Sequence, residues 1–221
     1  MADRAAKTRL YAEFAAVGKA LGNSGRLELL DLLAQGPRGV EDLAAAADMG
    51  LSTCSAHLQA LRAAGLVVSV RDGKRVVSSL ADEDVAELLV RLQAVAATHR
   101  PGTDRARDAY LGPGDTEAVS RTELLARARA GDVIVVDVRP GVEYAAGHLA
   151  GSVNIPLDEL AERLDELPSD TEVVAYCRGA YCVMAHDAVR LLTGRGYQAR
   201  RAGDGALEWR IAGMLEPSGA A

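Results

Sequence analysis

Residues 51–76 read LSTCSAHLQALRAAGLVVSVRDGKRV, and this stretch passes directly from a helical pattern to a hairpin pattern. Its first half repeats an apolar side chain every third or fourth residue, which predicts a helix with one buried stripe. The stripe consists of Leu51, Cys54, Leu58 and Leu61. Ser52 is a suitable N-cap for this helix and Gly65 a suitable stop.

The second half of the stretch predicts two strands. Residues 66–70 and 75–80 are rich in β-branched side chains, and Asp72-Gly73 between them favours a tight turn. Further helices are predicted at 4–21, from an N-cap at Ser24 to Gly36, at about 40–47 and at about 82–98. This order of helices and hairpin is that of a mainly α-helical winged helix-turn-helix, which places one helix in the major groove of DNA and its hairpin on phosphates.

The outward-facing and flanking side chains of this helix are small or hydrogen-bonding, and the hairpin tip is basic. We predict that they contact double-stranded operator DNA: Ser52, Thr53, Ser55, Ala56, His57, Gln59, Arg71, Lys74 and Arg75. His57 fits two interpretations, a groove contact or a half-buried structural residue. Cys54 lies on the buried stripe, so we interpret it as a packing residue.

The net charge of the chain, −6, at first argues against a nucleic-acid partner. However, the first 99 residues carry 11 basic and 12 acidic side chains, so the acidity lies mostly in the second half. Around the predicted hairpin, basic residues outnumber the single acid Asp72. Because local charge governs phosphate contact, the overall acidity does not exclude DNA binding.

Residues 99–117 are polar and contain two prolines and three glycines, which predicts a linker with about one helical turn inside it. The chain of 221 residues is long enough for two domains, which we place at residues 1–98 and 117–221 with a linker at 99–116. In the second domain, strands predicted at 133–138, 173–176 and 198–200 alternate with helices near 157–166, 183–194 and 204–213. A helix opened by a capping box of Ser120 and Glu123 precedes them. This alternation indicates an α/β layer fold with a parallel sheet.

The sequence YCRGAYC, residues 176–182, lies between a predicted strand and a predicted helix. A cysteine in such a loop faces unpaired backbone N–H groups and the positive end of a helix dipole, which predicts a lowered pKa for Cys177 and a nucleophilic thiolate. The same N–H groups would hold an anionic substrate or a persulfide. The predicted active-site loop also contains Arg178, Gly179, Ala180, Tyr181 and Cys182.

The first half resembles the ArsR/SmtB family of dimeric bacterial repressors over roughly residues 8–98. The Ser-x-His-Leu-x-x-Leu order and the Ala-Gly-Leu-Val order, which continues directly into the hairpin, carry the resemblance. It implies a homodimer formed by the first and last helices, near 4–21 and 82–98. Many members bind metals through cysteines in the helix before the recognition helix. Here that segment, VEDLAAAADM at 40–49, contains neither Cys nor His, so we expect no metal site.

The second half resembles rhodanese domains over about residues 117–217. VVDVRPGVEYAAGHLAGSVNIP, residues 135–156, is similar to their first signature, and ALEWRIAGM, residues 206–214, to their closing helix. The resemblance implies that Cys177 carries transferred sulfur. It also places four residues on family elements, Asp137 and Arg139 on Asp-x-Arg and Glu143 and His148 on Glu-Tyr…Gly-His. We interpret these four as residues that tie loops beneath the site, and we keep Asp137 with Cys177 and Arg178 as a catalytic candidate.

The length of the loop and its last residues bear on its chemistry. Phosphatase relatives of rhodanese have a longer loop with an Arg six positions after the Cys, where this sequence has Val183, so we do not expect phosphate-ester hydrolysis. Tyr181 and Cys182 stand where thiosulfate-using relatives carry small, polar or basic residues, which leaves the sulfur donor open. Cys182 fits two interpretations, a thiol that resolves a Cys177 persulfide and a packing residue. We interpret His186 as a helix-surface residue.

Two functions are consistent with this sequence. The first is a DNA-binding regulator, expected to be a repressor, in which Cys177 senses or transfers sulfane sulfur from a small sulfur-containing molecule. The alternative is a sulfurtransferase whose first half serves dimerisation or localisation. A third interpretation makes both domains interaction scaffolds. Three cysteines do not make a disulfide framework, and neither a membrane-length apolar run nor a signal-peptide pattern occurs. We therefore expect a cytoplasmic protein without a cofactor or a membrane partner.

Overall fold

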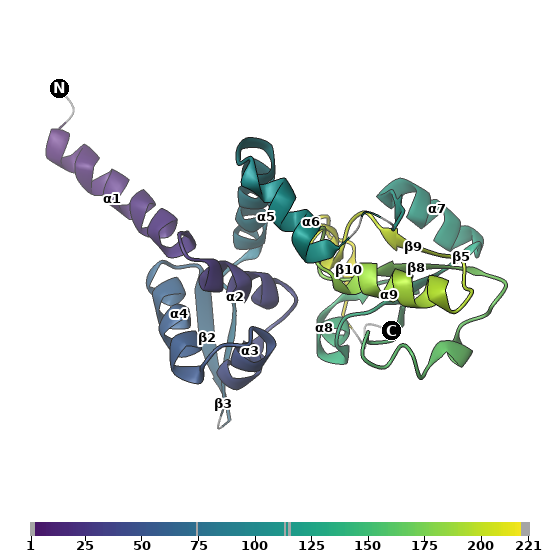
Figure 1. Cartoon of the computed structure of the whole chain (residues 1–221). Helices are drawn as coiled ribbons and strands as arrows, with labels where there is room; N and C mark the ends of the chain where they lie inside the picture. Colours follow the sequence, from purple (N-terminus) through teal and green to yellow (C-terminus); the bar gives the residue numbers. More distant parts are fainter. Residues whose placement is uncertain (1–2, 74, 113, 115, 218–221) are drawn as a thin grey trace. The chain divides into compact units, whose positions relative to one another are not determined.

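The computed structural model describes residues 3–73, 75–112, 114 and 116–217, and Figure 1 labels its helices and strands. The chain divides into two compact units between Arg91 and Leu92. This division falls inside the helix α5 (Glu83–His99). The predicted domain limits, 1–98 and 117–221, stay a prediction.

Four helices begin the first unit, and three of them pack around a leucine core. They are α1 (Arg4–Leu21), α2 (Ser24–Ala34), α3 (Val40–Ala46) and α4 (Leu51–Ala63). The core includes four buried leucines of α2 and two of α4: Leu29, Leu30, Leu32, Leu33, Leu58 and Leu61. The N-cap of α2 is Asn23, whose side-chain oxygen accepts a hydrogen bond from the N–H of Arg26 at 3.0 Å. The prediction of Ser24 as this cap was therefore wrong by one residue.

The predicted hairpin is present as β2 (Val67–Asp72) and β3 (Arg75–Leu80), paired antiparallel. Gly73 at the turn has a φ of 58°, in the left-handed region that favours glycine. The short strand β1 (Arg38–Gly39) pairs with the other edge of β3, and Figure 1 shows the hairpin beside α3 and α4. The first unit is therefore a winged helix-turn-helix.

A five-stranded parallel sheet forms the centre of the second unit. In spatial order its strands are β4 (Ala118–Val119), β9 (Ala199–Ala202), β8 (Glu172–Tyr176), β5 (Val133–Asp137) and β7 (Val153–Asn154). On one face, α9 (Met184–Gly194) packs against apolar side chains of β5 and β8, among them Val136, Val173 and Ala175. We call this group the α9-side cluster. On the other face lie α7 (Arg121–Ala130) and α10 (Ala206–Ile211), which contribute Leu124 and Trp209 to a second cluster. The predicted α/β layer fold with a parallel sheet is confirmed.

Two helices of the second unit differ from their predictions. Residues 157–163 form turns, with only a short 3-10 helix, η1 (Leu164–Glu166), at the end of the predicted helix. Leu160 and Leu167 are both buried in the α9-side cluster, so their helix-like spacing reflects core packing of a turning segment. In the predicted linker, α6 (Gly102–Leu111) is a full ten-residue helix, longer than the single turn expected. Arg190 of α9 holds its end by donating a hydrogen bond to the carbonyl of Leu111 at 2.8 Å.

Short elements complete the second unit beside its main sheet. They are α8 (Gly141–Ala146), β6 (His148–Leu149) and β10 (Leu215–Glu216). The strands β6 and β10 pair antiparallel in a separate two-stranded sheet that the sequence pattern did not predict.

A buried ion pair fixes the chain where β5 ends. Asp137 and Arg139 are at most 1% exposed, and the Arg139 Nε donates to both Asp137 carboxylate oxygens at 3.0 and 3.1 Å. Arg139 Nη2 also donates to the carbonyl of Gly147 at 2.8 Å, which ties the end of α8 to the strand. This arrangement agrees with the interpretation of these residues as ties between loops.

We predict that Arg139→Met destabilises the second unit by about 3–5 kcal/mol, because Asp137 is left as an uncompensated buried charge. Urea unfolding followed by the fluorescence of Trp209, the single tryptophan of the chain, measures this unit selectively. Adding Asp137→Asn to Arg139→Met should recover part of the loss, since the amide carries no charge. Equal stability of the single variant and the wild type would contradict a structural role for the pair.

Candidate functional site

The face of α4 that is not packed carries most of the predicted DNA contacts. Cys54, Leu58 and Leu61 are buried as predicted, whereas Leu51 is 49% exposed because it is the first residue of the helix. Gly50 is the N-cap of α4 and makes no side-chain hydrogen bond, so the prediction of Ser52 as the cap was wrong. The four exposed candidates are Ser52, Thr53, Ala56 and Gln59, and Ser55 is half-buried.

His57 lies on the side of α4 that approaches α2. It is half-buried, and a Cβ added at Gly25 would lie 3.1 Å from the imidazole Nε2. The ring therefore contacts the first turn of α2, as the structural interpretation of His57 requires. This contact leaves His57 less free to enter a groove than its exposed neighbours are.

The wing supplies positive charge at the turn between β2 and β3. Arg71 and Arg75 are both exposed, and the Arg71 Nε donates a hydrogen bond to the carbonyl of Gly73 at 3.1 Å. Lys74, the third predicted phosphate contact, lies outside the described residues. The two described arginines extend from the same end of the hairpin, where they could contact a DNA backbone.

Cys177 directly follows β8, in the loop that leads to α9. The residue is 3% exposed, and its thiol donates a hydrogen bond to the carbonyl of Cys182 at 3.4 Å. The N–H of Cys182 in turn donates to the carbonyl of Gly179 at 3.1 Å, so the loop folds back on the thiol. The structure thus brings together both cysteines of the predicted active-site loop.

The pKa values of the two thiols differ from the prediction. Burial, with the neighbouring Cys182, raises the pKa of Cys177 well above its usual value, although the N–H groups of Gly179 and Ala185 oppose this. The prediction of a lowered Cys177 pKa was wrong because desolvation outweighs the loop amides. The pKa of Cys182 is lowered, chiefly because the Cys177 thiol donates a hydrogen bond to it. Cys182 is therefore the more acidic thiol of the pair.

The guanidinium of Arg178 forms an ion pair with Glu143. Its Nε and Nη2 donate to the carboxylate of Glu143 at 2.6–3.1 Å, and the Glu143 side chain is fully buried. Because this ion pair connects the loop to α8, Arg178 is suited to holding the loop in place. The catalytic roles predicted for Arg178 and for the enclosed Asp137 stay predictions.

The start of α10 closes on the loop from the other side. The N–H groups of Ala206 and Leu207 donate to the carbonyls of Cys177 and Arg178 at 2.9 and 2.8 Å. A Cβ at Gly205 would lie 2.4 Å from the N atom of Gly179, so only glycine fits there. The start of α10 therefore holds the loop by direct backbone contact.

Sequence reasoning missed Glu208 of α10 and misplaced His186. The Glu208 carboxylate accepts a hydrogen bond from the N–H of Gly205 at 2.8 Å, and both its oxygens would lie 3.3 Å from a Cβ at Gly179. Burial raises the pKa of Glu208. His186 is buried, contrary to the predicted surface position, and its Nδ1 lies 2.8 Å from Thr116 Oγ1. The capping position of Glu208, three residues after Gly205, was the available signal for its contact with the loop.

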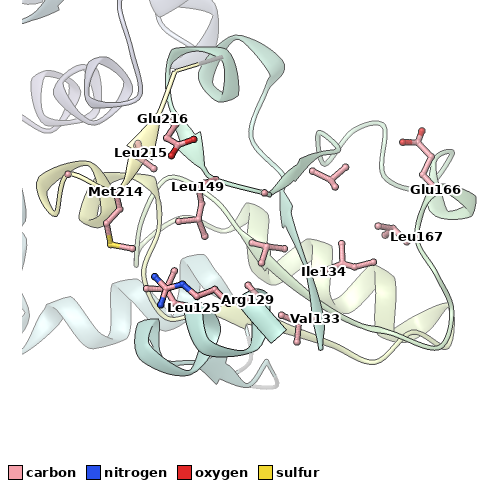
Figure 2. A pocket seen from close by; sticks show the side chains of 16 residues that line it. Leu125, Arg129, Val133, Ile134, Leu149, Glu166, Leu167, Met214, Leu215 and Glu216 are labelled. Atoms are coloured by element: carbon pink, nitrogen blue, oxygen red, sulfur yellow. The ribbon is translucent and has the colours of Figure 1, made fainter. Parts of the chain in front are cut away.

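A separate cavity of about 750 Å³ lies beside the first residues of β5. Figure 2 shows Leu125, Leu149, Val133 and Met214 around it. None of the described loop residues 177–182 lines this cavity, so it is distinct from the space around the thiol. No sequence motif indicated it.

Among the described residues, no three His, Cys, Asp or Glu side chains gather as a metal site would require. None of the helices in that part of the chain is both long and apolar enough to cross a membrane.

Comparisons with known proteins match both units. A model of the rhodanese-like domain matches residues 120–211, and a model described as bacterial regulatory protein, arsR family, matches residues 23–69. The chain is 51% identical over 214 residues to the HTH-type transcriptional regulator Rv0324 of Mycobacterium tuberculosis, which covers 97% of this chain and 94% of that protein.

Two further matches cover part of the chain. A protein named sulfurtransferase from Allochromatium vinosum is 33% identical over 66 residues, which are 30% of this chain and 60% of that protein. A solved structure is titled as the homodimeric winged helix-turn-helix DNA-binding domain, fragment 1-100, of Mb0332 from Mycobacterium bovis. It is 50% identical, covers 45% of this chain and 91% of that chain, and has a TM-score of 0.42.

Both resemblances stated from the sequence are confirmed by these family matches. The match to Rv0324 spans nearly the whole of both proteins, so the assignment applies to the two units together. The chain belongs to the arsR family of bacterial regulatory proteins, as an ArsR-type transcriptional regulator that carries a rhodanese-like domain in its second half.

Proposed function

We propose that this regulator binds operator DNA through α4 and its wing, and that sulfane sulfur on Cys177 changes this binding. The observation that supports the proposal most is the pair of thiols at Cys177 and Cys182, held in a closed loop on the same chain as a DNA-reading unit. The helix that carries metal-binding cysteines in many relatives, α3, has neither Cys nor His here. A sulfur signal would therefore replace a metal signal. The domain limits 1–98 and 117–221 belong to this proposal.

A homodimer is part of the proposed function. Leu10, Tyr11 and Phe14 of α1 are 53–61% exposed, and Val95 of α5 is 57% exposed. Apolar side chains with this exposure on the first and last helices of the winged helix are suited to a subunit interface. A two-fold dimer would present two copies of α4 to two half-sites of an operator.

The loop provides the groups that the transfer of a sulfur atom from a small persulfide to Cys177 requires. The Cys177 thiol lies against Cys182, whose pKa is lowered, so the Cys182 thiolate is suited to take the Cys177 proton as Cys177 attacks the outer sulfur of a small persulfide, RSSH. The donor S–S bond breaks, RS⁻ leaves with the electron pair, and Cys177 becomes Cys–S–SH. A second attack by Cys182 on the inner sulfur of Cys177 would form a disulfide and release hydrogen sulfide, which carries away the proton that Cys182 had taken. Cys182 would then act first as a base and later as the resolving thiol.

A sulfurtransferase enzyme is the second candidate function. The placement of Cys177 at the end of a buried strand, in a rhodanese-like domain, favours it. Steady-state turnover with thiosulfate and cyanide that disappears in Cys177→Ala, without specific DNA binding, would support this alternative.

We predict that reduced and persulfidated wild-type protein bind operator DNA with different affinities in a gel-shift titration. Cys177→Ser should bind with one affinity, whether or not it is treated with the persulfide donor. Cys54→Ala is the matched control, because Cys54 is buried in α4 and burial raises its pKa. This control should respond to the donor as the wild type does. Equal binding by reduced protein, persulfidated protein and Cys177→Ser would contradict sensing.

We predict that Arg75→Ala weakens binding to all DNA sequences and lowers the salt slope of the affinity by about one ion, because one phosphate contact is lost. Lys74→Ala should do the same. Gln59→Ala should instead change base preference, since its side chain is exposed on α4. Arg129→Ala removes an exposed positive charge from α7 of the second unit and serves as the control. An unchanged salt slope in Arg75→Ala and Lys74→Ala would remove the wing from the phosphate interface.

A further inference from the structure

Arg201 of β9 lies on the same face of the sheet as Cys177. In the parallel pairing of β8 with β9, Arg201 is opposite Ala175, two residues before Cys177. Side chains alternate between the faces of a strand, so Ala175 and Cys177 share one face, and both belong to the α9-side cluster. Ala199, two residues before Arg201, packs against the same cluster, whereas Ala202 belongs to the opposite one. Adjacent strands are only about 5 Å apart, so the long Arg201 side chain can reach the thiol.

Among the described residues, Arg201 has no carboxylate partner, unlike the other arginines at this sheet discussed below. Arg200, its neighbour on the opposite face, donates to Glu172 at 2.5 Å, and Arg127 donates to the same carboxylate at 2.6 Å. Arg121 pairs with Asp204 at 2.6 Å, and Arg178 pairs with Glu143. Within the described chain, the buried Nε of Arg201 has no hydrogen-bond partner. Its Nη1 makes only a long hydrogen bond, of 3.4 Å, to the carbonyl of Ala202.

The electrostatics agree with this placement. Burial lowers the pKa of Arg201, and the attraction to Cys177 opposes that effect. A guanidinium stays protonated near neutral pH in proteins, so a positive charge without a carboxylate remains beside the thiol. The titratable group among the main causes of the raised Cys177 pKa is Cys182, and Glu208 of α10 faces the loop at Gly179. Arg178, the cation of the loop itself, is already paired with Glu143.

We propose that Arg201 is the positioning residue that supplies positive charge to the sulfur of Cys177, where it stabilises the thiolate and attracts anionic reagents. This inference rests on the proposed sulfur chemistry of Cys177 and adds the residue that tunes it. A persulfide on Cys177 is more acidic than a thiol and carries negative charge where Arg201 can stabilise it. Burying the unpaired Nε of Arg201 costs folding free energy, and the interaction with this sulfur gives a reason why the arginine is kept there.

The test measures alkylation of Cys177 in the full chain, with Cys182→Ser as the background so that Cys177 is the only thiol of the loop. Peptide mass spectrometry follows the rates with neutral iodoacetamide and with anionic iodoacetate across a range of pH. In Arg201→Gln, the midpoint of the pH profile should rise by about one unit, because a nearby positive charge stabilises the thiolate. The ratio of the iodoacetate rate to the iodoacetamide rate should fall roughly three- to tenfold. Arg201→Lys should restore most of both quantities.

Arg200→Gln is the matched control, since it removes the adjacent arginine from the opposite face, and it should leave the midpoint and the rate ratio unchanged. Fluorescence of Trp209 reports whether each variant is folded, and Arg201→Gln and Arg201→Met should melt no lower than their background, because the buried Nε has no hydrogen-bond partner among the described residues and the Nη1 makes only a long hydrogen bond. Unchanged midpoint and ratio in Arg201→Gln, or equal shifts in Arg200→Gln, would overturn the inference. Unfolding of both Arg201→Gln and Arg201→Met would overturn it too, by showing a structural role. Alkylation requires neither a sulfur donor nor DNA, so this result is independent of whether the proposed function fails.

Discussion

The contact between the Cys177 loop and the start of α10 determines how the second unit can work. Two backbone N–H groups of α10 hold the carbonyls of Cys177 and Arg178, and Gly205 allows the two segments to approach because it has no side chain. Backbone contacts with the start of α10 thus fix the position of the thiol from one side of the loop. Glu143 holds the loop from α8 through Arg178, and Asp137 with Arg139 holds the segment that leads into α8. Each of these contacts leaves the thiol enclosed, and enclosure raises its pKa.

Most of the fold could be predicted from local patterns. The stripe of Cys54, Leu58 and Leu61 predicted α4, and Asp72-Gly73 predicted the hairpin turn, because both signals depend on neighbouring residues. Predictions failed where tertiary contacts decided the outcome. The apolar spacing around Leu160 resembles a helix, but those leucines are buried in turns. His186 lies at a position that looked exposed and is covered through its contact with Thr116.

The candidate site shows the same division between local and distant effects. The two cysteines are five residues apart in one loop, so their proximity followed from the sequence. The direction of the Cys177 pKa did not, because it depends on the depth of burial, which distant residues determine. Arg201 and Glu208 lie more than twenty residues further along the chain, and only the pairing of β8 with β9 and the position of α10 bring them to the loop. The local sequence around Arg201 does not show which carboxylates its neighbouring arginines bind, so its own lack of a carboxylate among the described residues could not be predicted.

In the proposed regulator, the sulfur state of Cys177 and the binding of operator DNA are coupled. The most direct measurement starts from a partly persulfidated preparation, equilibrated with a limiting amount of immobilised operator. Mass spectrometry of the Cys177 peptide then gives its persulfide content in the bound and the free protein. Coupling predicts that the persulfide content differs between the two fractions, and that the difference disappears with DNA of unrelated sequence. The same content in both fractions would contradict the account.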